Sequence, residues 1–267
     1  MGGPDRLLLV TGGQVNAAQL DQIRSAATGY RVERAELGAP IESYLPDVEI
    51  VAGSLPERDF AEARRLRWIH SWGAGVDRDL FPALVESDVV MTCSKGNGGI
   101  PLAEHVIVLM LMLARNLPNV LQAQREHRWV HAPHAELTGQ SLGIIGLGHA
   151  GTDLAAKARA FHMRVLGLRR TSTPDPNVDV LFGPDRLHEF LTSSDWVAVT
   201  CPVTRETYHM LGEDEFRAMR PTAYYINISR GAVADPAALE RAIRDGWIAG
   251  AGLCLLYTSD AADDLTR

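Results

Sequence analysis

The residues best suited to ligand chemistry form one glycine-rich segment: Gly146, Leu147, Gly148, His149, Ala150 and Gly151. The segment follows an apolar run at residues 142–145 and opens an alanine-rich run. In that context the first glycine permits a tight turn, the second lets the backbone approach a pyrophosphate, and the third lets a helix pack closely on a strand. A purely structural turn is the alternative. The placement between strand and helix favours dinucleotide binding, with the phosphates at the helix N-terminus.

A basic turn follows the next predicted strand, residues 164–168. An NAD site usually has an acidic residue here that binds the ribose 2′-hydroxyl. This chain instead has Arg169, Arg170, Thr171 and Ser172. Guanidinium and hydroxyl groups suit a 2′-phosphate, so the sequence favours NADP over NAD as the cofactor. An exposed basic turn that binds nothing is the alternative.

Cysteine and histidine side chains supply two further candidates for chemistry. Cys201 is a possible nucleophile, but no partner histidine is identifiable, which favours a packed or cofactor-facing thiol. His127, His131 and His134 are spaced closely enough to suggest a metal site. They lie in a stretch with tryptophan and proline and without an acidic ligand pattern, so a solvated loop without metal is favoured.

Composition and charge exclude several classes of function. The 267 residues, 46% hydrophobic and 22% charged, are typical of a globular protein with room for two domains. A net charge of −7 without basic runs argues against generic nucleic-acid or membrane binding. Three irregularly spaced cysteines favour a reducing compartment. We find no signal peptide, and the most apolar run, residues 106–113, is too short to span a bilayer. A cytoplasmic location is therefore expected.

Short β-rich and amphipathic runs alternate along the whole chain, which predicts an α/β protein built from parallel sheets. In the first hundred residues the β-rich runs are 7–10, 31–35, 49–52, 68–71 and 89–92, and the amphipathic runs are 17–27, 60–66 and 80–85. Residues 101–116 predict a helix that is apolar all round, buried, and linking two domains. Beyond it the expected strands are 142–145, 164–168, 196–200, 223–228 and 248–253, and the expected helices are 152–161, 187–192, 213–219 and 236–244.

Several motifs together make the chain resemble the D-isomer-specific 2-hydroxyacid dehydrogenase family, in particular its glyoxylate/hydroxypyruvate reductase-like members. They are WIHSWGAGVD at 68–77, IPLAEH at 100–105, the glycine segment, CPVT at 201–204 with the pair ET at 206–207, and INISRGAVAD at 226–235. The resemblance implies two doubly wound parallel-sheet domains. The first, residues 1–98, is expected to be a flavodoxin-like substrate domain. Residues 99–253 are expected to form the linker helix and an incomplete Rossmann dinucleotide-binding domain.

The resemblance also implies roles for particular residues. Arg230, just past a buried strand, is similar to the family's catalytic arginine, which holds the carboxylate and oxo group of a 2-oxo acid; a salt-bridged strand-end arginine is the alternative. The substrate carboxylate is expected to meet the backbone of Trp72, Gly73, Ala74, Gly75 and Val76, although a simple tight turn would use the same glycines. Further cofactor contacts are expected from Cys201, Pro202, Thr207, Ile228 and Ser229.

The pattern of the family breaks at residue 254. Relatives continue from the strand at 248–253 to an acidic loop with a catalytic Glu and later to a His that acts as general acid/base. Residues 254–267 contain neither, and no His follows His209. We therefore expect residues 254–267 to be a non-native tail and the chain as written to be severely impaired, because general acid/base catalysis contributes roughly 10²–10⁴-fold.

The resemblance implies an oxidoreductase that uses NADP or NAD to interconvert a small 2-oxo acid, such as glyoxylate or hydroxypyruvate, and its D-2-hydroxy acid. The intact protein is expected to be a homodimer, without nucleic-acid or membrane partners. Two alternatives stay open: a relative of the formate or phosphite type, and a non-catalytic module of the corepressor kind that senses the dinucleotide. A panel of substrates separates the first, and a search for protein partners separates the second.

Overall fold

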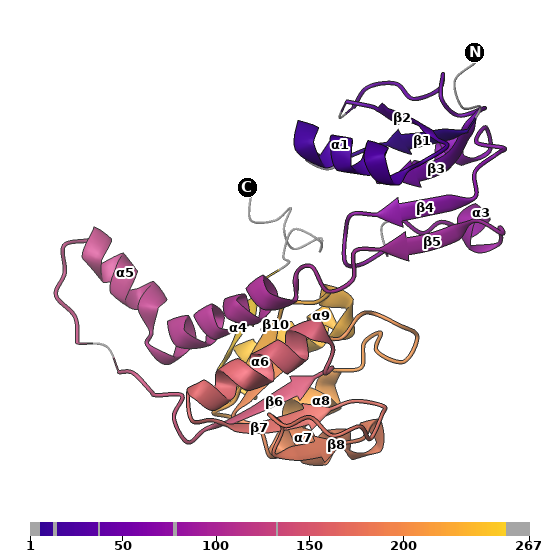
Figure 1. The fold of residues 1–267 in the computed structure, drawn as a ribbon. Helices are drawn as coiled ribbons and strands as arrows, with labels where there is room; N and C mark the ends of the chain where they lie inside the picture. Colours follow the sequence, from indigo (N-terminus) through magenta and orange to yellow (C-terminus); the bar gives the residue numbers. More distant parts are fainter. Residues whose placement is uncertain (1–5, 13–14, 37, 77–78, 132, 255–267) are drawn as a thin grey trace. The chain divides into compact units, whose positions relative to one another are not determined.

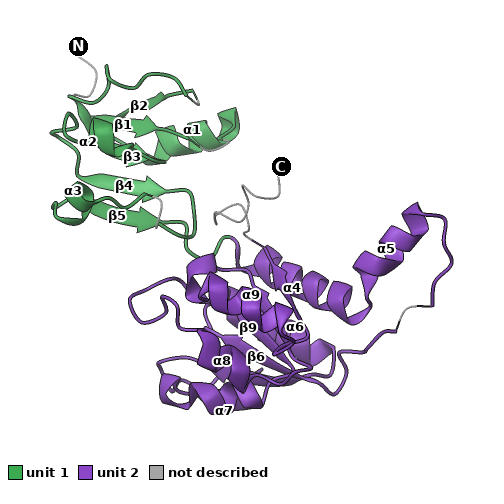
Figure 2. Ribbon diagram, turned by 180° about the vertical axis from the view of Figure 1, so that it is seen from behind, with its two compact units in different colours: residues 1–97 green, residues 98–267 purple. Residues whose placement is uncertain are grey.

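The computed structural model describes residues 6–12, 15–36, 38–76, 79–131 and 133–254. The chain divides into two compact units, Met1–Asn97 and Gly98–Arg267 (Figure 2). Each unit is built around its own parallel β-sheet, so the predicted α/β class with two parallel-sheet domains is confirmed.

Unit 1 contains a five-stranded sheet in the order β2-β1-β3-β4-β5 (Figure 1). Its strands are β1 Leu7–Val10, β2 Arg31–Arg34, β3 Val48–Ala52, β4 Trp68–Ser71 and β5 Val90–Cys93. The two central strands β1 and β3 read as nearly continuous apolar runs because helices or loops cover both of their faces. All the pairings are parallel, and this order is that of flavodoxin-like sheets, as predicted.

Three helices and their flanking loops cover the sheet of unit 1. They are α1 Ala17–Ala26, α2 Glu57–Phe60 and α3 Pro82–Val85. Helix α1 begins at Asn16, whose side chain accepts a hydrogen bond from the Gln19 N–H while the Gln19 side chain accepts one from the Asn16 N–H. It packs Leu20 on one sheet face, against Leu8 and Val10 of β1. The opposite face, which includes Leu7 and Leu9, packs on the segments around α2 and α3.

Unit 2 contains a six-stranded parallel sheet in the order β11-β10-β9-β6-β7-β8. The strands are β6 Ser141–Ile145, β7 Arg164–Leu168, β8 Val180–Phe182, β9 Trp196–Val199, β10 Tyr224–Asn227 and β11 Gly250–Leu253. Within the unit this is the order 3-2-1-4-5-6 of dinucleotide-binding folds, read from the other side. The strand order reverses between β6 and β9, and the crevice at that point is where such sheets bind ligands.

Helices cover both faces of the six-stranded sheet, and one further helix, α5, packs on α4 instead. The helices of this unit are α4 Gly99–Ala114, α5 Leu117–Arg125, α6 His149–Ala160, α7 Leu187–Thr192, α8 Glu213–Ala218 and α9 Pro236–Arg244. Helices α4 and α6 pack on the face that presents Ile144 and Ala198 (Figure 1). Helices α7, α8 and α9 pack on the other face, against Val197 and Tyr225. Helix α9 begins at Asp235, whose carboxylate accepts hydrogen bonds from the N–H groups of Ala237 and Ala238.

Helix α4 differs from its prediction because only part of its surface is buried. Ala103, Val106 and Met110 lie in the core, but Ile100 is 61% exposed and Val108 is 48% exposed. The apolar sequence of α4 indicated that the helix is buried on every side, but unit 2 covers only part of its surface. Among the described residues no single helix is long and apolar enough to cross a membrane, and α4 and α5 reach that length only as a pair bent by 67°.

Three other elements were placed wrongly or missed. Residues 61–66 form turns rather than the predicted amphipathic helix. Their hydrogen bonds run from Ala63 N to Phe60 O and from Leu66 N to Ala63 O, a spacing of three residues that resembles a helix in the sequence pattern. Helix α5 was not predicted, although a proline in its first turn is a start signal as well as a breaker. Strand β8 has three residues, too few to show a period.

Candidate functional site

The glycine segment lies at the point where the strand order reverses. Gly146 follows β6 with φ +94°, a left-handed conformation that favours glycine. A Cβ atom there would also stand 2.8 Å from the Cβ atom of Cys201, so the turn needs glycine for space as well. Helix α6 then begins after Gly148, and the backbone N–H groups of its first turn have no carbonyl oxygen within the helix to bond. The predicted strand–turn–helix is therefore present.

The other two glycines have opposite surroundings. A Cβ atom at Gly151 would stand 2.0 Å from the carbonyl oxygen of Gly146, so α6 approaches the turn as closely as backbone allows. A Cβ atom at Gly148 would meet no atom within 4 Å. Gly148 is exposed and borders open space at the helix N-terminus. Gly151 thus serves packing, while Gly148 leaves room for a ligand beside the backbone.

Not every residue of the segment offers its side chain to a ligand. Leu147 is buried among the residues between the sheet and helices α4 and α6, so it can bind a ligand only through its backbone. His149 and Ala150 belong to the first turn of α6, where Gly99 of α4 packs so closely that a Cβ atom on Gly99 would lie 3.1 Å from the His149 Cβ.

Strand β9 supplies the opposite wall of the crevice. The Thr200 hydroxyl donates to the carbonyl oxygen of Gly146, and Cys201 packs directly against that glycine. Burial raises the pKa of the Cys201 thiol from its ordinary value to about 11. A thiol with a raised pKa is protonated at neutral pH, which is the opposite of an activated nucleophile. The side chain is therefore a packed thiol beside the glycine turn.

The loop after β9 is stabilised by its own threonines. The Thr207 hydroxyl donates to the Pro202 carbonyl oxygen at 2.7 Å and accepts from the Thr204 N–H at 2.7 Å. Thr207 therefore fixes the loop, and a direct contact of Thr207 or Pro202 with a cofactor stays a prediction. The Thr204 hydroxyl donates to Glu206 at 2.6 Å.

The basic turn after β7 has one guanidinium half-buried and one exposed. Arg169 donates from Nε to the Thr171 carbonyl oxygen at 3.1 Å, while its Nη2 is buried and has no hydrogen-bond partner within the described part of the chain. Unpaired buried donors are rare, so this nitrogen is a candidate donor to an acceptor outside the described part of the chain. Arg170 and Thr171 are exposed beside it.

The basic turn also lies near enough to the β9 loop to interact electrostatically. The pKa of Glu206 lies below its ordinary value, first because of the hydrogen bond from Thr204, with smaller contributions from its own backbone and from the charges of Arg170 and Arg205. Arg205 was not among the residues singled out from the sequence. Its signal was its place in CPVTRET, next to the residues that were.

Arg230 follows β10 at the same carboxyl edge of the sheet as Gly146, because both parallel strands β6 and β10 are neighbours of β9. Its backbone is extended (φ −136°, ψ 141°), and it precedes the short 3-10 helix η2 Gly231–Val233. The guanidinium donates from Nη1 to the Ser229 carbonyl oxygen at 3.0 Å. Ile228 is buried against helix α4's side of the sheet, so a cofactor can reach only its backbone.

Asn227 shapes this turn and was missed as a functional residue in the sequence. Its Oδ1 accepts from the Ser229 N–H at 2.9 Å and from the Ser229 hydroxyl at 3.1 Å, and its Nδ2 donates to the Arg230 carbonyl oxygen at 2.9 Å. The available signal was a polar amide at the end of the otherwise apolar strand AYYIN, three residues before an arginine.

The second predicted site, in unit 1, is the loop after β4. Three carbonyl oxygens of this loop accept hydrogen bonds from other residues of unit 1. The Trp72 oxygen accepts from Asn97 Nδ2 at 3.4 Å, and the Gly73 oxygen accepts from the Ser94 N–H at 3.1 Å. The Ala74 oxygen accepts from the Cys93 thiol. In the described part of the chain, the N–H groups of Ala74, Gly75 and Val76 donate to no protein acceptor. Successive unpaired N–H groups on an exposed loop suit an anion such as a carboxylate.

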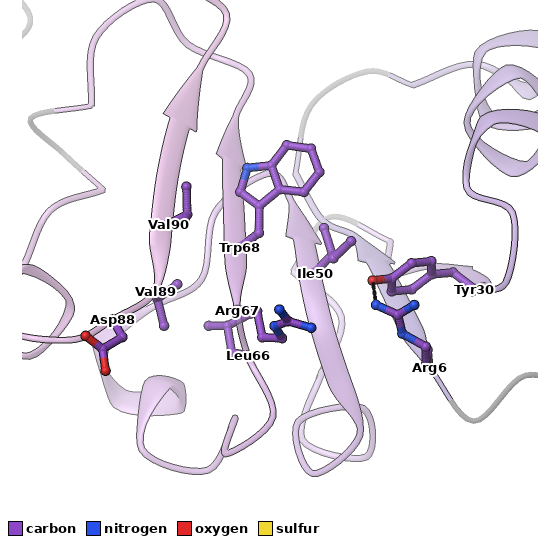
Figure 3. Close-up of a pocket in the computed structure, with 9 residues that line it drawn as sticks. All are labelled: Arg6, Tyr30, Ile50, Leu66, Arg67, Trp68, Asp88, Val89 and Val90. Carbon is purple, nitrogen blue, oxygen red and sulfur yellow. Dashed lines mark hydrogen bonds between the residues drawn. The ribbon is translucent and has the colours of Figure 1, made fainter.

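One pocket of unit 1 is separate from these residues. It has a volume of about 700 Å³, and Figure 3 shows its lining, with the Arg6 side chain hydrogen-bonded to Tyr30. Its lining residues Arg6, Arg67 and Asp88 precede β1, β4 and β5, so the pocket lies at the amino ends of the strands. Ligand sites in open α/β sheets lie at the carboxyl ends, where the loop after β4 is found.

The histidines singled out from the sequence do not form a cluster in the structure. Across the described ranges no group of three or more His, Cys, Asp or Glu side chains could hold a metal ion. Residue His127 has φ +53° in the turn that follows α5, and His131 and His134 are exposed. The three cysteines are free thiols.

Known proteins resemble this chain in sequence and in fold. Residues 107–265 match the family model described as D-isomer specific 2-hydroxyacid dehydrogenase, NAD binding domain. The glyoxylate reductase of Thermococcus gammatolerans is 34% identical over 220 residues, which cover 78% of this chain and 66% of that protein. The chain thus matches just under two thirds of that relative's length.

Two solved structures extend the likeness to the whole fold. A D-isomer specific 2-hydroxyacid dehydrogenase family protein from Aeromonas salmonicida superposes with a TM-score of 0.82 at 28% identity, over 93% of this chain and 80% of that one. A D-isomer specific 2-hydroxyacid dehydrogenase from Xanthobacter autotrophicus, solved with NADPH and MES, has a TM-score of 0.73 at 30% identity, over 92% of this chain and 79% of that one. The chain belongs to the D-isomer-specific 2-hydroxyacid dehydrogenase family.

Proposed function

We propose that the protein reduces a small 2-oxo acid, such as glyoxylate or hydroxypyruvate, to its D-2-hydroxy acid with NADPH. One observation carries the proposal: the Gly146 turn and Arg230 lie at the same carboxyl edge of one sheet, on either side of β9, the strand that precedes Cys201. A phosphate-binding turn and a guanidinium in that relation suit a dinucleotide and a carboxylate substrate side by side.

The residues fit a dinucleotide. The open space beside Gly148 leaves room for a pyrophosphate, and the N-terminus of α6 offers it N–H donors. Cys201, Ser229 and the backbone of Ile228 border the same edge of the sheet. When bound, the reduced nicotinamide supplies the hydride that the carbonyl carbon accepts. Residues of the chain bind and orient the reactants around it, and we assign no proton donor among the described residues.

The preference for NADP rests on the basic turn. Arg169 has a buried Nη2 without a partner in the described chain, and Arg170 and Thr171 are exposed next to it. A 2′-phosphate supplies acceptors and negative charge to these groups, whereas a 2′-hydroxyl supplies neither the charge nor three oxygens. The related Xanthobacter protein was solved with NADPH.

Each unit by itself carries groups that suit a carboxylate. In unit 2, Arg230 offers a planar fork of N–H donors that matches a carboxylate with an adjacent oxo group, and so holds the carbonyl in a fixed orientation. In unit 1, the N–H groups of Ala74, Gly75 and Val76, which donate to no acceptor among the described residues, are suited to a carboxylate. Unit 1 is accordingly proposed as the substrate domain and unit 2 as the cofactor domain.

The protein is further proposed to form a homodimer through the region of α5. Helix α5 packs on α4 and extends away from the sheet of its unit in both views (Figures 1 and 2). This region exposes apolar side chains: Val108 at 48%, Leu121 at 44% and Trp129 at 99%. A tryptophan with nearly its whole surface in water is costly to leave so, and a second copy of the chain would cover it. A cytoplasmic location stays a prediction.

The experiment that tests the proposed function separates binding from turnover. The folded protein is titrated with NADPH and NADH by nicotinamide fluorescence, and then, at saturating NADPH, with oxamate, a non-reducible analogue of a 2-oxo acid, by calorimetry. We expect NADPH to bind more tightly than NADH and oxamate to bind only with the cofactor present. A turnover panel of glyoxylate, hydroxypyruvate, formate and phosphite identifies the substrate class. Folded protein that binds neither dinucleotide would contradict the proposal.

A further inference from the structure

The side chain of Asn227 is an amide buried at the end of β10, 6% exposed. It uses its full hydrogen-bonding capacity. The oxygen accepts from the N–H and the hydroxyl of Ser229, and the nitrogen donates to the Arg230 carbonyl oxygen and, at 2.9 Å, to the phenol oxygen of Tyr225. Two donors and two acceptor positions are all that an amide has. A buried polar network that is satisfied in this way fixes the groups that it joins.

The groups that it joins are backbone atoms of Ser229 and Arg230, which set the position of the Arg230 side chain. Asn227 holds Ser229 at its N–H and Arg230 at its carbonyl, so both sides of the peptide that precedes Arg230 are tied to one side chain. The extended backbone of Arg230 and the contact of its Nη1 with the Ser229 carbonyl oxygen follow from that turn. An arginine that orients a substrate loses much of its effect when its root shifts by about 1 Å.

The Arg230 carbonyl and the Ser229 N–H fix which way the amide faces, and Tyr225 holds the amide in place. Its ring is fully buried and packs edge-on against Phe216, with ring centroids 5.4 Å apart. Burial raises the pKa of the Tyr225 phenol well above its ordinary value, so the phenol stays protonated. A flipped amide would bring Oδ1 to the Arg230 carbonyl oxygen, where two acceptors repel each other. The observed orientation is therefore the one in which Nδ2 serves both Tyr225 and Arg230.

We infer that Asn227, with its amide held by Tyr225, is a positioning residue for Arg230 in 2-oxo acid binding. The inference rests on the proposed function, because Arg230 is taken to bind the substrate. It predicts more than a structural role would: the effect of Asn227 on substrate affinity acts through Arg230 and disappears when the guanidinium is absent.

A double-mutant cycle tests the inference in the full-length chain. Oxamate affinity is measured by calorimetry at saturating NADPH for the wild type, Asn227→Ala, Arg230→Lys and the double variant. Arg230→Lys keeps a cation, so weakened binding stays measurable. Ser141→Ala is the matched control, because Ser141 is equally buried and hydrogen-bonded but lies at the amino end of β6, away from the site. Thermal unfolding of each variant reports its loss of stability.

We expect Asn227→Ala to weaken oxamate binding by about tenfold in the wild type, the size expected for lost hydrogen bonds to a substrate-binding group. In the Arg230→Lys background the same substitution should change affinity less than about twofold. Tyr225→Phe, a milder change that keeps the ring in place, should weaken binding by about two- to threefold, again only when Arg230 is present. Ser141→Ala should lower stability without changing oxamate affinity.

The outcomes distinguish the inference from the function on which it rests. Equal losses in both backgrounds, an Asn227→Ala variant that binds oxamate like the wild type, or an equal loss in Ser141→Ala would overturn the positioning role alone. If the wild type binds no oxamate, or if Arg230→Lys binds it unchanged, the proposed function fails and the inference fails with it. If Asn227→Ala does not fold, the Tyr225→Phe cycle decides by the same criteria.

Discussion

Gly151 lies so close to Gly146 that a Cβ atom on Gly151 would stand 2.0 Å from the Gly146 carbonyl oxygen. This relationship joins the start of α6 to the turn after β6. It means that close backbone packing holds the helix N-terminus at the turn after β6. The same segment leaves open space at Gly148, so the packing role and the proposed ligand-binding role fall on different glycines.

A pair of glycine substitutions should separate packing from cofactor binding. Gly151→Ala is expected to lower stability by roughly 1–3 kcal/mol, as overpacking does, and to abolish NADPH binding. Gly148→Ala should fold with nearly wild-type stability, because its Cβ meets no atom within 4 Å, yet lose NADPH affinity by tenfold or more, because the Cβ occupies the space proposed for the pyrophosphate. Thermal unfolding and NADPH fluorescence measure the two effects. Unchanged NADPH binding in Gly148→Ala would count against the proposed cofactor site.

The basic turn after β7 should set the choice between cofactors. Replacing Arg169 and Arg170 by alanine is expected to weaken NADPH binding by about 10- to 100-fold, since each lost charge-assisted hydrogen bond costs about 1.5–3 kcal/mol at most and surface contacts less, while NADH binding stays within about twofold. Arg164→Ala is the matched control, because Arg164 is an exposed arginine at the amino end of the same strand. Equal losses for NADPH and NADH would show that the turn does not recognise the 2′-phosphate.

The Cys201 thiol should react slowly with alkylating reagents. With a pKa of about 11, only about a thousandth of these thiols is ionised at pH 8. Iodoacetamide labelling, followed by mass spectrometry of the peptide, is expected to be slow at pH 8 and to accelerate by nearly tenfold for each pH unit up to pH 10. Cys201→Ser should keep NADPH binding. Fast labelling at neutral pH would revive the alternative of a nucleophilic cysteine.

Ionised Asp179 should make the free energy of unfolding depend on pH in the acid range. Its pKa is lowered, first by the hydrogen bond from the Val165 N–H and, against the effect of burial, by Arg159. A lowered folded-state pKa adds stability above the unfolded-state value, near 3.8, and this is lost as the pH falls below it. Asp179→Asn is therefore expected to cost about 1 kcal/mol at pH 7, allowing for solvent screening, and the difference from the wild type should shrink below about pH 4. Denaturant unfolding against pH measures it, with the exposed Glu240→Gln as control. A difference that is constant with pH would contradict this.

The exposed tryptophan after α5 should control self-association. Trp129→Ala combined with Leu121→Asp is expected to shift a dimer to a monomer. The two changes remove apolar area from the proposed interface and add a charge whose burial is unfavourable. Light scattering after size exclusion measures the mass. Val85→Asp, an equally simple change of an exposed apolar side chain in unit 1, should leave the mass unchanged. A wild type that is monomeric at high protein concentration would refute the proposed dimer.

Sequence reasoning predicted most of the unit 2 sheet because its strands are short apolar runs and its helices begin with clear signals, such as Asp235 before Pro236. It also predicted the strand–turn–helix at the glycine segment, because each of the three glycines has its own role in such a turn. It failed where local pattern is ambiguous: the turns at 61–66 repeat the spacing of a helix, and β8 is too short to show a period.

By itself the sequence determined the residue types available for chemistry, the family resemblance, and most of the order of strands and helices along the chain, because these depend on local periodicity, turn chemistry and motif. The tertiary structure decided which residues meet. It brought Cys201 against Gly146, turned the Asn227 amide onto the backbone of Arg230, and left the Arg169 Nη2 buried without a partner in the described chain. Such contacts join residues on different strands or follow from how a turn folds back. They depend on packing and hydrogen-bond satisfaction in three dimensions, which no local pattern contains.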